Sequence, residues 1–305
     1  MALDIYLPVA GVSTNAVALI GAGGAVGFLS GMFGVGGGFL ITPLLMFLGI
    51  PTTVAIATGA NQAIATSVAG AMSQWKRGNV DTKMGFYLLV GGLVGALIGI
   101  KLVTVLRQIG QFELFVALCY VVLLGVIGGL MLIESVATMR RSSSASQAKS
   151  KAGRHNWVHG LPFKTRFPRS RLYISAIPPL LIGGFTGVLT AVMGVGGGFV
   201  LVPAMVYLLN MRTIVAVGTS LFNIVFVSAF ATLMQAVSVK CVDVLLATLL
   251  IVSGVIGTQI GTRAGSALKG EQLRALLALL VLAVCVRVAV GLVSEPSFLY
   301  SMSSN

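Results

Sequence analysis

The stretch GVGGG at residues 34–38 interrupts an apolar run, and the same five letters return at residues 194–198. Each glycine inside a helix lowers helix stability by about 1 kcal/mol relative to alanine. The interrupted runs cover residues 13–49 and 173–209, 37 residues each, which is too long for one crossing of roughly 20 residues. We therefore interpret each run as a hairpin of two helical arms, open to being re-entrant, with GVGGG at its tip.

The two copies belong to a longer internal repeat. Residues 22–53 align with residues 182–213 without a gap, and 13 of 32 positions are identical. After a shift of two residues the match continues, for example from Asp81 to Asp243. The chain is therefore expected to hold two related halves of about five membrane segments each.

Each half continues with three uninterrupted apolar segments. They lie at roughly 53–75, 84–106 and 112–134 in the first half, and at 213–235, 243–265 and 272–293 in the second. The expected domains are a first transmembrane repeat at 1–134, a basic Ser-rich loop at 135–171, a second transmembrane repeat at 172–294 and a C-terminal tail at 295–305.

Composition places the chain in a membrane. Hydrophobic residues make up 57% and charged residues 9%, whereas soluble domains carry about 25% charged residues. The expected fold class is an all-α polytopic membrane protein. The net charge of +13 is concentrated between Arg140 and Arg171, where nine of the twenty cations lie without an acidic residue. This distribution indicates a flexible cytoplasmic loop and no nucleic-acid partner.

The distribution of Lys and Arg also predicts orientation. If each hairpin starts and ends on one side of the membrane, 16 cations fall inside and 3 outside; if each broken run crosses once, the split is 13 to 6. The positive-inside rule favours the first arrangement, which gives two inverted halves in the cytoplasmic membrane with both termini outside.

Broken helices at matching positions of inverted halves point to a substrate site of a transporter. Glycine can turn its backbone N–H groups into a concave nest, and a helix N-terminus adds partial positive charge there. Phe39 and Phe199 open the arms that follow the glycines. Buried amides without carboxylates suit an anion. The alternative is that these glycines only permit a tight helical hairpin.

The seven acidic residues all lie at predicted segment ends or in loops. A cation transporter or a proton relay is expected to hold an acidic residue near the membrane centre. We interpret Asp81 and Asp243 as matched loop caps, with proton coupling at these residues as the alternative. No metal or cofactor is expected, since His155 and His159 lie in the polar loop and the three cysteines lack CxxC spacing.

Polar residues inside the long segments cluster after the hairpins and share a helical face in each half. They line the anion site or form hydrogen bonds between helices. Gln259 is a further lining candidate, and Arg287 is one because an intramembrane arginine is a functional candidate by default. The candidate substrate-binding residues are Gly36, Gly37, Gly38, Thr58, Asn61, Gln62, Gly196, Gly197, Gly198, Thr219, Ser220, Asn223, Gln259 and Arg287.

Glycines also recur at four-residue intervals in two of the uninterrupted segments. This spacing is typical of close helix packing and not of chemistry. The glycines are Gly91, Gly95 and Gly99 in the first half, and Gly257, Gly261 and Gly265 in the second.

Two stretches, MFGVGGGFLITPLLMFLGIPTTVAIATGAN and VMGVGGGFVLVPAMVYLLNMRTIVAVGTSLFN, carry a family resemblance. They resemble the TauE/SafE family of sulfite and organosulfur anion transporters, over about residues 22–134 and 182–293. The second copy keeps VGTS at Val217–Ser220, a stretch associated with the family, where the first reads ATGA at Ala57–Ala60.

The resemblance implies export or uptake of sulfite, sulfonates or related sulfur anions. We expect a secondary transporter that works by alternating access, with a passive anion channel as the alternative. The sequence has no catalytic cluster in its apolar segments, so an enzyme is not expected. The expected partners are a small anion and the lipid bilayer, and the sequence leaves a homo-oligomer open.

Overall fold

The computed structural model describes residues 4–142, 164–167, 169–170, 172–239, 243–267 and 270–294. Residues 143–163 of the predicted basic loop (135–171) and the tail at 295–305 lie outside this range, whereas the loop's first residues, 135–142, belong to a helix. The described chain is mostly helical. Its helices are α1 (Ala16–Phe33), α2 (Gly38–Phe47), α3 (Thr52–Lys76), α4 (Thr82–Gln108), α5 (Phe112–Ser142), α6 (Ile177–Met193), α7 (Gly198–Tyr207), α8 (Thr213–Val239), α9 (Val244–Ala267) and α10 (Gly270–Ser294).

The two glycine-rich stretches break their segments as expected, between α1 and α2 and between α6 and α7. Gly34 ends α1 with φ +70° and donates its N–H to the Ser30 carbonyl at 2.8 Å. Gly194 ends α6 with φ +68° and donates to Thr190 at 2.9 Å. Glycine is the residue that most readily adopts this left-handed backbone conformation. This explains why a glycine ends both helices.

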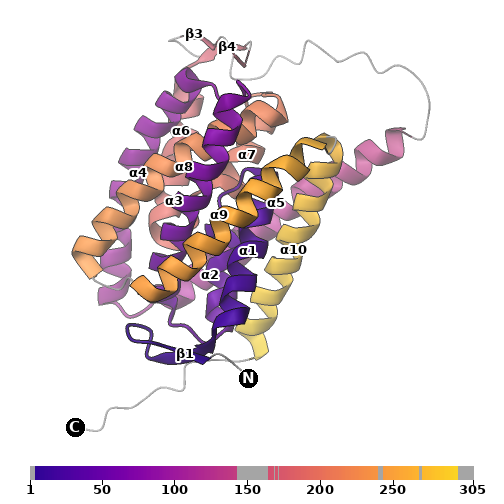
Figure 1. Cartoon of the computed structure of the whole chain (residues 1–305). Coiled ribbons are helices and arrows are strands. Elements are labelled where there is room, and N and C mark those ends of the chain that lie inside the picture. The colour runs from indigo at the N-terminus through magenta and orange to yellow at the C-terminus, as the bar shows by residue number, and fades with distance from the viewer. Residues whose placement is uncertain are drawn as a thin grey trace.

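Two short antiparallel β-hairpins correct the all-α expectation. The first pairs β1 (Asp4–Leu7) with β2 (Val12–Asn15), and the second pairs β3 (Lys164–Phe167) with β4 (Leu172–Ser175). Each hairpin directly precedes the broken segment of its half, and Figure 1 shows the hairpins at opposite ends of the helix bundle. Part of the predicted basic loop is therefore ordered as β3.

The helices pack in pairs that follow the internal repeat, so that each pair has an equivalent pair or is its own equivalent. α1 packs along α9 and α4 along α6, while α3 packs on α8 and α5 on α10. A Cβ on Gly95 would collide with the carbonyl oxygen of Gly184, and one on Gly257 would collide with that of Gly24. The prediction that the spaced glycines serve close packing is confirmed.

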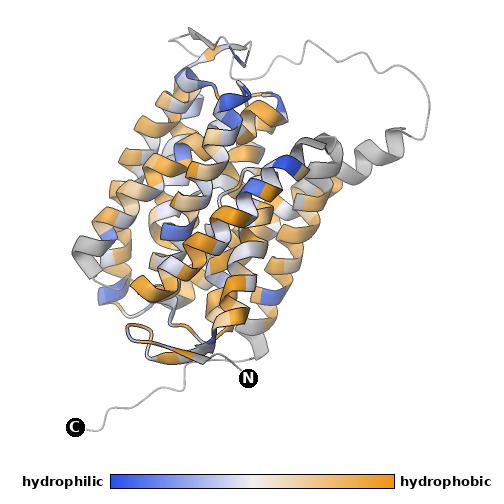
Figure 2. Cartoon of the chain, viewed as in Figure 1, coloured by the Kyte–Doolittle hydropathy of each residue, from blue (hydrophilic) through white to orange (hydrophobic). Residues whose placement is uncertain are grey.

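The bundle has an apolar exterior. Within the described residues, four stretches are long and apolar enough to cross a membrane: Ala16–Phe33, Thr82–Gln108, Thr213–Gln235 and Val244–Gly265. Apolar residues dominate the visible faces of the helices, and blue segments gather mainly toward the ends of the bundle (Figure 2). Shorter apolar stretches lie in α2, α5, α6, α7 and α10. The chain is thus built as a multi-pass membrane protein.

Two buried carboxylates connect each half to the hairpin of the other. Asp81 caps α4 through the N–H of Met84, and its Oδ2 accepts hydrogen bonds from the Ser170 N–H at 3.0 Å and hydroxyl at 2.6 Å. Asp243 caps α9, and its Oδ2 accepts from the N–H of Val9 at 3.1 Å. The two residues therefore cap helices at matching positions of the repeat, which agrees with their interpretation as matched caps.

Candidate functional site

The two glycine tips touch each other inside the protein. A Cβ built on Gly38 would lie 2.6 Å from the Gly194 carbonyl oxygen, and one on Gly198 would collide with the Val35 carbonyl oxygen. The rings of Phe39 and Phe199 stack just beyond this contact, with centroids 5.8 Å apart. Gly38 and Gly198 therefore allow the two backbones to approach closely, which no larger residue would permit.

One hydroxyl-bearing side chain faces each tip from a long helix. A Cβ on Gly36 would lie 3.4 Å from Ser67 Oγ of α3, and a Cβ on Gly196 would lie 3.2 Å from Ser228 Oγ of α8. Ile224 of α8 packs against both glycines. The seam between α3 and α8 thus lies along the place where the tips meet.

The middle glycines of the two tips have different surroundings. The N–H of Gly37 points to Thr66 Oγ1 at 3.4 Å, and its φ of −62° suits any residue. Gly197 has φ +68° and packs against Thr186 and Thr190 of α6. The two tips are therefore identical in sequence but differ in backbone conformation and in surroundings.

Several buried polar atoms near the predicted site have no hydrogen-bond partner among the described residues. Gln62 donates its Nε2 to the Gly23 carbonyl at 3.2 Å, but its Oε1 is without a partner. Such atoms are rare in native proteins and usually mark a place for water, an ion or a ligand. Three of these atoms, Gln62 Oε1, Ser67 Oγ and Ser228 Oγ, belong to side chains that lie beside the tips. Two more, Thr58 Oγ1 and Asn223 Oδ1, belong to predicted site residues on α3 and α8.

Other predicted residues have structural partners. Thr219 Oγ1 accepts a hydrogen bond from the Asp81 N–H at 3.1 Å, and Ser220 Oγ donates to the Gly34 carbonyl at 2.6 Å. Half-buried Asn61 donates to a carbonyl of its own helix at 3.0 Å. Ser220 thereby fixes the first tip against the second half, which is a positioning role of the kind that hydrogen bonds between helices provide.

Gln259 and Arg287 lie apart from the tips. Gln259 is exposed on α9, on the same side as the exposed residues Ile256 and Ile260. Arg287 is exposed on α10, and its guanidinium lies over the ring of Phe47 at 4.9 Å. Since neither contacts the glycines, we leave both out of the proposed site.

The structure also adds residues that the sequence reasoning missed. Thr66, Ser67 and Ser228 face the tips, and so do Thr186 and Thr190. The repeat could have pointed to Thr66 and Ser228, because they occupy equivalent positions in the two halves. They are as far apart in sequence as Asp81 and Asp243.

The described neighbours of the tips are neutral. They are backbone groups and aliphatic, hydroxyl and amide side chains, with the N-termini of α2 and α7 at the same place. Neutral donors and helix N-termini stabilise negative charge. This set of groups can hold a small anion without a compensating cation.

Comparison with known proteins agrees with this architecture. The sequence profile of the sulfite exporter TauE/SafE family matches residues 19–288. The chain is 30% identical over 276 residues to a probable membrane transporter protein of Xylella fastidiosa strain 9a5c, an alignment that covers 89% of this chain and 94% of that protein. It is 26% identical over 266 residues to the probable membrane transporter protein YjnA of Bacillus subtilis strain 168, covering 87% of this chain and 96% of the relative.

No solved structure matches the chain. The family match spans both halves and both glycine tips, and the relatives align over nearly their whole length. Family members are membrane transporters and not enzymes. The chain belongs to the TauE/SafE sulfite exporter family of membrane transporters.

Proposed function

We propose that the chain is a secondary transporter that moves a small sulfur-containing anion, such as sulfite or a sulfonate, across the cytoplasmic membrane. One observation carries the proposal: the two glycine tips meet where buried hydroxyl and amide atoms have no protein partner among the described residues. The name of the family supports a sulfur oxyanion as the substrate.

The proposed site binds the anion through neutral donors. A hydroxyl can rotate its hydrogen toward a bound oxygen, and backbone N–H groups at a glycine tip can point in the same direction. In an apolar interior such bonds are stronger than in water, because the local dielectric constant is low. The proposed ligands are Gly36, Gly37, Gly196, Gly197, Thr58, Gln62, Ser67, Asn223 and Ser228, with Gly38, Gly198, Thr219, Ser220 and Asn61 positioning them.

Alternating access follows from the proposed arrangement of the halves. We place a pseudo-two-fold axis in the membrane plane, so that the tips enter from opposite faces and both termini lie outside. Two observations support this placement. The β-hairpins lie at opposite ends of the bundle, and each is held by the aspartate of the other half, Ser170 by Asp81 and Val9 by Asp243. Rocking of one half against the other then opens the site to one side at a time.

Flux through proteoliposomes tests the proposal. Purified protein should carry sulfite, thiosulfate, sulfate or an alkyl sulfonate faster than protein-free vesicles, with at least one strongly preferred. The double variant Ser67→Ala, Ser228→Ala should lose most of this flux, whereas Thr248→Ala on the exposed face of α9 should keep it. Equal flux with and without protein for every anion would contradict the function.

A gradient separates the transporter from a passive channel built on the same tips. Substrate accumulated against its own gradient, driven by a proton or ion gradient, would exclude a channel. Flux that only follows the substrate gradient and never exceeds it would contradict the secondary transporter.

A further inference from the structure

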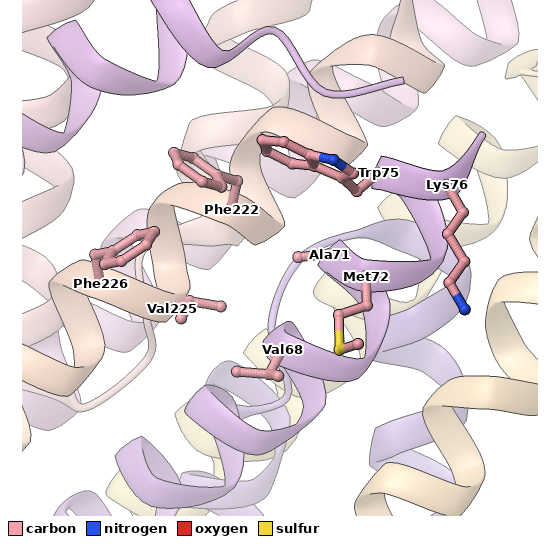
Figure 3. A pocket seen from close by; sticks show the side chains of 8 residues that line it. All are labelled: Val68, Ala71, Met72, Trp75, Lys76, Phe222, Val225 and Phe226. Atoms are coloured by element: carbon pink, nitrogen blue, oxygen red, sulfur yellow. The ribbon is translucent and has the colours of Figure 1, made fainter. Parts of the chain in front are cut away.

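A pocket of about 280 Å³ lies between α3 and α8 (Figure 3). Seven of its eight lining side chains are apolar, and the eighth is Lys76. None of the lining residues belongs to the anion site proposed above, and the exposed side chains of Met72 and Phe226 show that the pocket opens outward. It is therefore a second site, on the exterior of the bundle.

Aromatic rings form much of the pocket wall. Trp75 of α3 lies against Phe222 of α8 with ring centroids 6.0 Å apart, and Phe222 meets Phe226 edge-on at 5.0 Å. These rings run from the end of α3 along the next turn of α8, with Val68 facing them (Figure 3). Apart from the indole N–H of Trp75, this wall carries no hydrogen-bond donor for a small oxyanion, whereas its apolar surface matches that of a hydrocarbon chain.

One end of the pocket carries a positive charge, which favours a ligand with an anionic group at that end. Trp75 and Lys76 are the last two residues of α3, and both are exposed. Tryptophan and lysine at a helix end are typical of the boundary between hydrocarbon and lipid headgroups. Lys76 therefore offers a cation where an apolar groove reaches the headgroup level, beside the exposed Arg77.

We propose that this pocket binds an anionic phospholipid, with one acyl chain lying between α3 and α8 and its phosphate paired with Lys76. The apolar lining binds the acyl chain, and Lys76 favours a headgroup with negative charge. The site is independent of substrate transport and requires only that the chain spans a bilayer.

Native mass spectrometry of the purified full chain tests the site with two probes, phosphatidylglycerol and phosphatidylcholine. The wild type should retain phosphatidylglycerol preferentially. Lys76→Gln should reduce that preference about fivefold, the effect of one cation near an anionic headgroup. The matched control Lys83→Gln removes an exposed cation outside the pocket and should leave the preference unchanged.

Filling the pocket tests the acyl chain separately. Ala71→Leu should reduce retention of both lipids, whereas Ala283→Leu on the exposed face of α10 should not. Size-exclusion chromatography establishes that both variants are folded and monodisperse. Wild-type retention in Ala71→Leu, or an unchanged headgroup preference in Lys76→Gln, would overturn the proposal.

Discussion

Phe39 and Phe199 stack on each other at equivalent positions of the repeat, each as the second residue of the short helix that follows its glycine tip. Both rings are fully buried, at 1% exposure. The contact between the tips is thus part of the protein core and forms without a ligand. The proposed anion site at this contact would therefore be formed before the substrate binds, and such preorganisation lowers the entropic cost of binding.

The first prediction concerns the close approach of the tips. Gly198→Ala places a Cβ against the Val35 carbonyl and the Ile224 side chain, so the thermal midpoint should fall sharply. Overpacking of a core typically costs about 1–3 kcal/mol. Gly21→Ala in α1 meets no atom within 4 Å and serves as the control. Equal midpoints for the two variants would show that the tips are looser than the structure indicates.

The second prediction concerns the pairing of α4 with α6. Gly95→Ala drives a Cβ into the Gly184 backbone and should reduce the yield of folded protein. Gly129→Ala in α5, where the Cβ meets no atom within 4 Å, should insert and purify normally. Fluorescence-detected size-exclusion chromatography measures both. A monodisperse Gly95→Ala at wild-type yield would argue against tight packing of these helices.

The third prediction concerns the carboxylate that holds the second hairpin. Asp81→Ala removes a helix cap and two hydrogen bonds from Ser170, so stability should fall by about 2 kcal/mol. Ser170→Ala should cost less, and the double variant should be hardly worse than Asp81→Ala. The thermal midpoints of the three variants measure this coupling.

The same carboxylates should be dispensable for binding. The double variant Asp81→Asn, Asp243→Asn should bind substrate nearly as well as the wild type, because both side chains serve caps and hairpins in the structure. Lost binding in a folded double variant would instead indicate carboxylate-coupled transport.

The fourth prediction concerns orientation. Single cysteines at Ser143 and Ser301, introduced after replacement of the three native cysteines, should be labelled from the cytoplasmic and the external side respectively. Both positions lie outside the described residues. Labelling of the two cysteines from the same side would contradict two inverted halves.

Much of the helical architecture was predictable from the repeated glycine stretch. It breaks the first segment of each half, and the observed breaks fall at the expected residues. The two β-hairpins were not predictable, because strands of four residues such as DIYL and KTRF are too short to show an alternating pattern. Their position depends on tertiary hydrogen bonds to Asp81 and Asp243.

The proposed site could be predicted only in part. A shared helical face made Gln62, Asn223 and Ser220 equal candidates. The sequence could not show that Ser220 bonds to the first tip, while Gln62 Oε1 and Asn223 Oδ1 have no partner among the described residues. Gln259 could have been excluded, because Gly257 and Gly261 define the packed face of α9 and Gln259 falls on the other side. Ser67 gained significance only when the fold placed it opposite Gly36.

The two middle glycines are unequal as tests of the site. Alanine at position 197 would be strained at φ +68° and would crowd Thr186, so its effects on folding and binding would mix. Alanine at position 37 fits the backbone, and its Cβ would lie 3.3 Å from Val26 and 3.5 Å from Thr66 Oγ1. Gly37→Ala is therefore expected to fold.

The most direct test of the proposed anion site is the affinity of purified Gly37→Ala for sulfite and an alkyl sulfonate, measured by isothermal titration calorimetry beside the wild type and Gly21→Ala. The added methyl group occupies space beside Thr66 and Gln62, where the anion is proposed to bind. Binding should weaken by at least about tenfold in Gly37→Ala, or about 1.4 kcal/mol, and stay unchanged in Gly21→Ala. Wild-type affinity in a folded Gly37→Ala would show that the glycines serve only the helical hairpin and that the anion binds elsewhere.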